Sequence, residues 1–395
     1  MPTTKATGRA TFLELFFDLV FAYALARISA RAVEDFALVS GVGGGWSAVT
    51  ASGKLLLLFY ALWGIWQSIA WTTSRYDPHH DWLQLIVIVA LVASMVMGVA
   101  IPQAFLETGL AFATAYVIAQ LSRPVILLLA LGPHPYRRLY VRMTIIFSAT
   151  GAVWITGALL PTNPRVVLWA SAITVEYFVT RFGWPVPWLG RSNIALRDIA
   201  GEHLAERYQQ FFLVALGQTI AVAGFAYNTG PYRFGQTAAF ALALATSILL
   251  WRIYVQRAGQ LLGEAVAKAR HPATIGWSVA DTHLVIVVGL TATAIGYELT
   301  IKYPLSPPQI PWIAMIIGGP VLFLAGRARF EYEVFSRVSP SRWIAALVLL
   351  ASVPILVRHP PLISAALVVA VLAAVAVADA RRARGRPPEP AAPPY

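Results

Sequence analysis

The sequence contains no cysteine, which excludes disulfide bonds, thiolate nucleophiles and cysteine-ligated metal sites. Charged residues are scarce as well: they make up 12% of the 395 residues, whereas 58% are hydrophobic and the mean hydropathy is +0.66. A water-soluble globular protein needs more polar side chains than this to cover its surface. The composition therefore predicts a membrane protein.

The chain also lacks the short stretches of alternating polarity that mark a membrane β-barrel. Its apolar runs are continuous and about twenty residues long, the length at which an α-helix crosses a bilayer. We therefore predict an all-α, polytopic helical membrane protein with about twelve transmembrane helices. The predicted spans are residues 11–33, 53–72, 82–105, 108–131, 141–160, 165–184, 203–227, 236–257, 279–299, 309–327, 341–357 and 361–379.

Lysine and arginine concentrate in alternate loops, among them Arg137 and Arg138 after the fourth predicted span, and in the C-terminal tail. By the positive-inside rule, and with an even number of spans, both termini are predicted to lie on the cytoplasmic side of the cell (inner or plasma) membrane. The net charge of +12 follows this topology, so it indicates contact with the lipid bilayer and no nucleic-acid partner. The predicted parts are a cytoplasmic segment 1–10, a single transmembrane domain 11–380 and a disordered Arg- and Pro-rich tail 381–395.

A weak internal repeat divides the transmembrane domain into two candidate halves, at about 11–184 and 203–380. Aligning Glu14 with Glu206 pairs the first predicted span with the seventh, and a similar match pairs the third with the ninth. Transporters often arise by duplication of this kind. A parallel six-plus-six repeat is therefore a hypothesis for the fold.

Ionisable and polar residues lie within the predicted spans. Glu14 and Asp18 are one helical turn apart in the first span. A charged acid at a helix centre costs about 2.5 to 3.5 kcal/mol on insertion scales, so such acids are usually partnered and often functional. On the predicted topology, the charged groups of five spans reach the cytoplasmic leaflet. The predicted polar cluster comprises Glu14, Asp18, Arg123, Glu176, His203, Glu206, Arg207, Gln210, Gln218, Asp281 and His283.

Other readings of these residues stay open. The charged groups also suit stabilising salt bridges near the membrane surface, where long side chains reach water. His203 and Glu206, with Asp281 and His283, supply nitrogen and oxygen ligands, but their spacing is not a dense ligand repeat, so no metal or cofactor is predicted. Tryptophans near predicted span ends, such as Trp66, are expected to be interfacial anchors. No phosphate-binding loop occurs, which argues against ATP-driven transport by this chain alone.

Three short motifs carry a resemblance to a known family. The sequence Phe12–Phe21 resembles the opening signature of the bacterial low temperature requirement A (LtrA) family. A second signature of that family is similar to His203–Tyr208 followed by Leu216–Ile220. The ninth predicted span, with Gly289 and Gly296, is a weaker third match.

The resemblance runs from about residue 11 to 380 and implies a polytopic membrane protein that is linked by name to growth in the cold. It does not imply a substrate. Gln218 stands where the family usually has glutamate, which removes an acid from the seventh span.

Two function hypotheses follow, a transporter or channel and an intramembrane enzyme. We favour the first, because twelve predicted spans with a weak internal repeat match the architecture of a transporter. In a proton- or ion-coupled secondary transporter or channel, Glu14 and Asp18 would exchange protons or bind the cation, and Arg207 or Arg123 would provide the counter-charge. The histidines of the seventh and ninth spans would relay protons or orient the acids.

The alternative hypothesis is an intramembrane enzyme that acts on a lipophilic substrate. Asp18 or Glu206, kept protonated by apolar surroundings, would then be the catalytic general acid.

Overall fold

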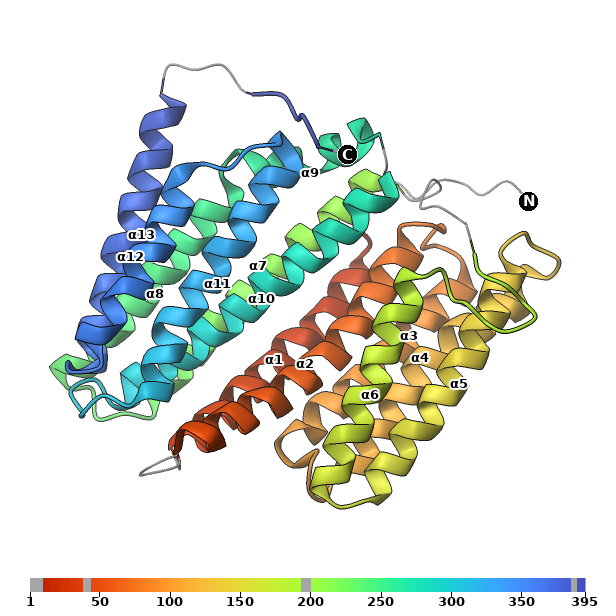
Figure 1. Cartoon of the computed structure of the whole chain (residues 1–395), viewed down its shortest axis with the longest axis horizontal. Coiled ribbons are helices and arrows are strands. Elements are labelled where there is room, and N and C mark those ends of the chain that lie inside the picture. Colours follow the sequence, from red (N-terminus) through yellow and green to blue (C-terminus); the bar gives the residue numbers. More distant parts are fainter. Residues whose placement is uncertain (1–9, 38–43, 193–199, 271, 385–388, 395) are drawn as a thin grey trace. The chain divides into compact units, whose positions relative to one another are not determined.

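The computed structural model describes residues 10–37, 44–192, 200–270, 272–384 and 389–394. Within these ranges the chain forms α-helices joined by short connections, and no β-strand is present (Figure 1). The predicted segment 1–10 lies outside them except for Ala10. The helices are α1 Phe12–Ala37, α2 Gly44–Thr73, α3 Asp81–Ala100, α4 Gly109–Leu131, α5 Arg137–Leu159, α6 Thr162–Arg181, α7 Gly201–Asn228, α8 Phe234–Tyr254, α9 Gln260–Lys268, α10 Pro272–Lys302, α11 Ile310–Phe335, α12 Pro340–Leu356 and α13 Pro361–Ala383.

Each of the twelve predicted spans overlaps one of these α-helices, and α9 lies between two of the spans. Nine helices of the described chain are long and apolar enough to cross a membrane. The other three that match predicted spans are α1 and α6, which carry charged residues along their length, and α12, which has 17 residues. The prediction of an all-helical, multi-pass membrane protein is confirmed, whereas the count of twelve spans and the repeat stay predictions.

The helices fall into two compact units, which we describe separately. The first unit comprises Met1–Ile28 and Thr50–Leu204, and the second comprises Ser29–Val49 and Ala205–Tyr395. In the first unit, α3 packs on α4, α4 on α5 and α5 on α6 (Figure 1). Aromatic rings fill the space between α4, α5 and α6, where Phe112, Trp154 and Trp169 are fully buried.

Arg165, in the first turn of α6, forms hydrogen bonds with the segment that follows α3 and with the end of α5. Its guanidinium donates hydrogen bonds to five backbone carbonyls and is only 6% exposed. Carbonyl groups at a helix C-terminus have no hydrogen-bond donor within their own helix. The planar guanidinium of arginine carries five N–H groups in a fixed geometry, so one side chain can pair with several of these carbonyls. The acceptors are the carbonyls of Ala104, Leu106, Gly157, Ala158 and Leu160.

We expect Arg165→Lys to destabilise the protein by about 2 kcal/mol or more, because an ammonium has three donors in a different geometry and leaves carbonyls unpaired. Thermal unfolding of the purified protein in detergent measures this effect. Arg138→Lys, at an exposed position of α5, is the matched control and should leave the melting temperature unchanged. Equal melting temperatures for the two variants would contradict the structural role of Arg165.

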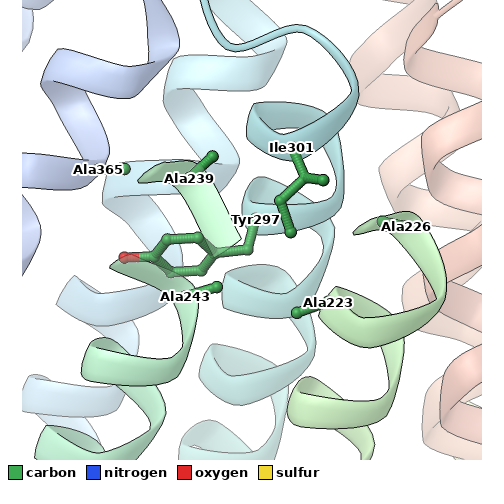
Figure 2. Packing of buried hydrophobic residues seen from close by; sticks show 7 residues of the cluster. All are labelled: Ala223, Ala226, Ala239, Ala243, Tyr297, Ile301 and Ala365. Carbon is green, nitrogen blue, oxygen red and sulfur yellow. The ribbon is translucent and has the colours of Figure 1, made fainter. Parts of the chain in front are cut away.

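The second unit is held together by small residues that let its helices approach closely. Alanines of α7, α8 and α13 surround Tyr297 and Ile301 of α10 (Figure 2). The Tyr297 hydroxyl is hydrogen-bonded to Thr246 of α8, so the buried polar tip of the ring has a partner. The cluster consists of Ala223, Ala226, Ala239, Ala243, Tyr297, Ile301 and Ala365.

Helices α10 and α11 approach each other closely at two glycines on each helix. Gly289 and Gly296 lie seven residues apart on α10, as do Gly319 and Gly326 on α11. A methyl group on Gly289 would lie 2.6 Å from the backbone nitrogen of Phe323, well inside van der Waals contact. Small residues at such a seam let membrane helices pack backbone to backbone. We call these four residues the glycine seam.

Candidate functional site

The first candidate residue, Glu14, has a clear role at the start of α1. The side-chain oxygen of Thr11 accepts a hydrogen bond from the Glu14 backbone N–H at 3.4 Å, and Glu14 Oε2 accepts one from the Thr11 backbone N–H at 2.8 Å. This reciprocal pair is a capping box, in which the residue before the helix and the third residue within it satisfy each other's N–H groups. Glu14 therefore helps to define the helix end.

The same carboxylate contacts a buried histidine. His203, at the start of α7, is fully buried, and its Nε2 lies 3.4 Å from Glu14 Oε2, an ion-pair distance. Its Nδ1 lies 2.9 Å from the hydroxyl of Ser74, which follows α2. The backbone N–H of Ala200 donates to the Ser74 carbonyl at 2.9 Å, which fixes the start of α7 beside the end of α2. Three helix ends of the first unit thus meet at Glu14, Ser74 and His203.

The hydrogen bonds of Ser74 and His203 indicate which of their atoms carry protons. The Ser74 hydroxyl donates its one proton to the Ala70 carbonyl at 2.7 Å, so it accepts from His203 Nδ1. With Nδ1 protonated, Nε2 faces Glu14 Oε2 either as a second N–H or as a lone pair. One proton between these two atoms therefore distinguishes a charged imidazolium–carboxylate pair from a neutral imidazole–carboxylic acid pair.

Asp18 lies one turn farther along α1 and is also fully buried. Its Oδ1 accepts a hydrogen bond of 2.8 Å from the indole Nε1 of Trp66 on α2. Trp66 is itself 0% exposed, so its expected role as an interfacial anchor is wrong. Its ring packs against Trp63 on the same helix. The indole instead holds a buried acid in a fixed orientation.

The first unit contains a second buried polar chain, between α4 and α6. Tyr116 donates a hydrogen bond to Glu176, and Gln120 donates one of 3.0 Å to the Tyr116 oxygen. Arg123, one turn beyond Gln120, lies over the ring of Phe147 at 5.9 Å from its centroid. Among the described residues Arg123 forms no ion pair with a carboxylate. The role of Arg123 as a counter-charge stays a prediction.

In the second unit, α7 carries the predicted polar stripe as a hydrogen-bonded series. Buried Arg207 donates from Nη1 to Gln210 Oε1 at 3.3 Å, and Gln210 Nε2 donates to Glu206 Oε1 at 3.1 Å. Farther along, Gln218 is buried and donates to the hydroxyl of Ser29 at 3.1 Å. Gln218 thus joins α7 to the part of α1 that belongs to this unit.

His283 of α10 has both ring nitrogens occupied. Nδ1 lies 2.8 Å from the Val279 carbonyl, which can only accept, and Nε2 lies 3.0 Å from the Tyr254 hydroxyl. Its ring stacks on Tyr208 with 4.7 Å between centroids. His283 is therefore a histidine whose hydrogen bonds are satisfied in a helical core. Asp281, two residues earlier, is partly buried on the same helix.

The family to which the protein belongs is shown by a match that covers almost the whole sequence. Residues 9–377 match the family described as Bacterial low temperature requirement A protein (LtrA). The chain belongs to the LtrA family. It is also 32% identical over 347 residues to the Rhizobium meliloti (strain 1021) protein named "Uncharacterized protein RA0937", and the match covers 87% of this chain and 82% of that protein. No solved structure matches the chain.

The LtrA motifs now have physical explanations in the described residues. The opening motif combines the cap acid Glu14 with the buried acid Asp18, and the second motif begins at the buried His203. Sequence reasoning missed Ser74 and Thr11, although the spacing of Thr11 and Glu14 is the sequence signature of a capping box.

Within the residues that the structure describes, no group of three or more histidine and acidic side chains is arranged to hold a metal ion. The expectation of one pocket shared by all eleven cluster residues stays a prediction, since those residues are divided between the two units.

Proposed function

We propose that this LtrA-family protein is a proton- or ion-coupled secondary transporter or channel of the cell membrane, with both termini in the cytoplasm. The observation that carries the proposal is the buried chain Ser74–His203–Glu14, with Asp18 one turn away. Ionisable groups sequestered in this way within membrane-spanning helices are characteristic of proton and ion pathways.

With a proton between His203 Nε2 and Glu14 Oε2 the pair has no net charge, and without that proton the pair carries one negative charge. In an apolar surrounding, the charged and neutral forms of such a pair interact very differently with their neighbours. Because the pair joins the start of α7 to the start of α1, gain or loss of that proton changes the force between two helix ends. Such a link between protonation and helix packing is what proton-coupled transport requires.

Asp18 is the second proposed proton or cation site. Its carboxylate accepts the hydrogen bond from buried Trp66, and Phe17 and Phe21 of the same helix are buried as well. The indole N–H of Trp66 orients this carboxylate, which supplies the titratable group that a proton or cation would bind. Together, Glu14 and Asp18 supply two acids on one face of α1.

Reconstitution tests the proposal. The purified protein in liposomes that contain a pH-sensitive dye should dissipate an imposed proton or cation gradient, and Asp18→Asn should abolish this flux. The asparagine keeps an oxygen acceptor for Trp66, so the variant removes the titratable group and retains the hydrogen bond. Glu107→Gln, at an exposed position outside the helices, is the matched control and should retain full flux.

Two results would argue against transport. Wild-type liposomes that leak no faster than protein-free liposomes would remove the basis of the proposal. If those liposomes also converted a lipid-soluble compound, the intramembrane-enzyme hypothesis would take its place.

A further inference from the structure

An arginine-rich pocket lies at one end of the second unit and has no role in the proposed transport chain. Its volume is about 120 Å³, and it is formed where α11 ends, α12 begins and α13 ends. Four guanidinium and three carboxylate groups line it. The lining residues are Gln256, Arg327, Glu331, Phe335, Arg337, Ser339, Arg342, Asp379, Arg382 and Glu389.

Two of the arginines are almost completely buried and held in place by the fold. Arg327 is 2% exposed, and its Nε and Nη2 donate to the carbonyls of Ile253 and Gln256 at 2.9 and 2.8 Å. Arg342 is 3% exposed and pairs with Asp379 at 2.7 Å. These bonds fix the positions of two positive charges at the pocket wall.

Each of these guanidiniums keeps a nitrogen without a hydrogen-bond acceptor in the described chain. Arg327 Nη1 lies 4.0 Å from Glu331 Oε2, and Arg342 Nε lies 3.6 Å from the same oxygen. Both distances are too long for hydrogen bonds. Burying a hydrogen-bond donor without an acceptor costs free energy. These two nitrogens are therefore available to donate hydrogen bonds to an anionic oxygen in the pocket.

The C-terminal segment already places one carboxylate in this pocket. Arg337 donates two hydrogen bonds to Glu389, which raises the pKa of the Arg337 guanidinium above its ordinary value. The Ala392 N–H donates to the Val334 carbonyl at 2.9 Å, and Ser336 donates to the Ala392 carbonyl at 2.6 Å. Glu389–Pro394 thus lies along the end of α11.

We propose that this pocket is a binding site for the phosphate group of an anionic ligand, which takes the place of the Glu389 carboxylate. Arginine forks bind carboxylate and phosphate oxygens with the same bidentate geometry, so Glu389 occupies the position of such a group. Without Glu389 the lining has four guanidiniums and two carboxylates. Its excess of two positive charges matches a phosphate monoester.

Size and position restrict the ligand further. A volume of about 120 Å³ holds a phosphate group with a few water molecules and excludes a bulky ligand. The pocket lies at the ends of α11 and α13, which are both long and apolar enough to span a membrane, and the ends of membrane-spanning helices reach headgroup depth. Two sources of phosphate have access to this depth: an anionic lipid headgroup and a phosphate-bearing solute.

Binding measurements on the full-length protein test this assignment independently of any flux. Inorganic phosphate is titrated by calorimetry in detergent, and nanodiscs with phosphatidic acid are compared by thermal stability with nanodiscs of phosphatidylcholine alone. Arg337→Gln should weaken binding about tenfold, the effect expected for one charge-assisted hydrogen-bond pair, and Glu389→Gln should strengthen it about tenfold. Arg337 is half exposed and lies outside the helices, so its variant should fold. Arg138→Gln, which removes an exposed arginine of the first unit, is the control for net charge.

The outcomes separate the two sources. Opposite effects of Arg337→Gln and Glu389→Gln on inorganic phosphate binding would support a site for a soluble phosphate group. The same opposite effects seen with phosphatidic acid alone would support a lipid headgroup. The proposal is overturned if Arg337→Gln behaves like Arg138→Gln with both probes, or if Glu389→Gln binds neither probe more tightly than the wild type.

Discussion

Replacing Gly319 by alanine is expected to lower the free energy of unfolding by about 3 kcal/mol, the upper part of the range for an overpacked core. The added methyl group would overlap the backbone nitrogen of Thr293 on α10 and lie 2.8 Å from its Cα. Backbone atoms cannot rotate away as a side chain can, so α10 and α11 would have to separate. The separation would also loosen the contacts at Gly289, whose space is bounded by the Gly319 carbonyl.

The neighbouring residue provides a matched control. A methyl group on Gly318 would meet no atom within 4 Å, although Gly318 lies on the same helix and in the same turn. Gly318→Ala should therefore be neutral or stabilise the protein by up to about 1 kcal/mol, since alanine favours a helix more than glycine does. Thermal or steric-trapping unfolding of both variants in the same detergent gives the comparison. Equal stabilities would mean that α10 and α11 are not in backbone contact at this point.

The glycine seam also illustrates which parts of the fold could be predicted from the sequence. Continuous apolar runs were sufficient to place an α-helix over every predicted span, because burial in a bilayer demands internal hydrogen bonding at each residue. Gly289 and Gly296 were noticed only as part of the family resemblance. Which residues of α11 they face depends on how the two helices are rotated against each other, and hydropathy carries no information about that rotation.

The candidate site, like the fold, could be predicted from the sequence only in part. Helical spacing placed Glu14 and Asp18 on one face, and the structure buries both. The partner of Asp18, Trp66, and the partner of His203, Ser74, were not predicted, because Trp66 lies on α2 and Ser74 directly follows that helix, whose rotation about its axis is set by packing. A tryptophan near the end of an apolar run matches an interfacial anchor in composition, and only its neighbours distinguish the two roles.

His203→Ala is expected to destabilise the protein by about 3 kcal/mol or more, because it removes a fully buried side chain together with one member of a buried ion pair. Glu14→Gln should cost less, because glutamine also serves at the third position of a capping box. That variant keeps the hydrogen bond that caps α1 and removes the charge opposite His203. It therefore isolates the pairing of the two side chains from the capping of the helix.

A double-mutant cycle of these two changes, measured by reversible unfolding in detergent, should give a coupling of about 1 to 3 kcal/mol. The same cycle with Glu107→Gln in place of Glu14→Gln should be additive, since Glu107 is exposed and lies outside the helices. If the His203–Glu14 cycle were additive as well, Glu14 would act as a helix cap alone. No proton would then be shared between the two helix ends, and the transport proposal would rest on Asp18 only.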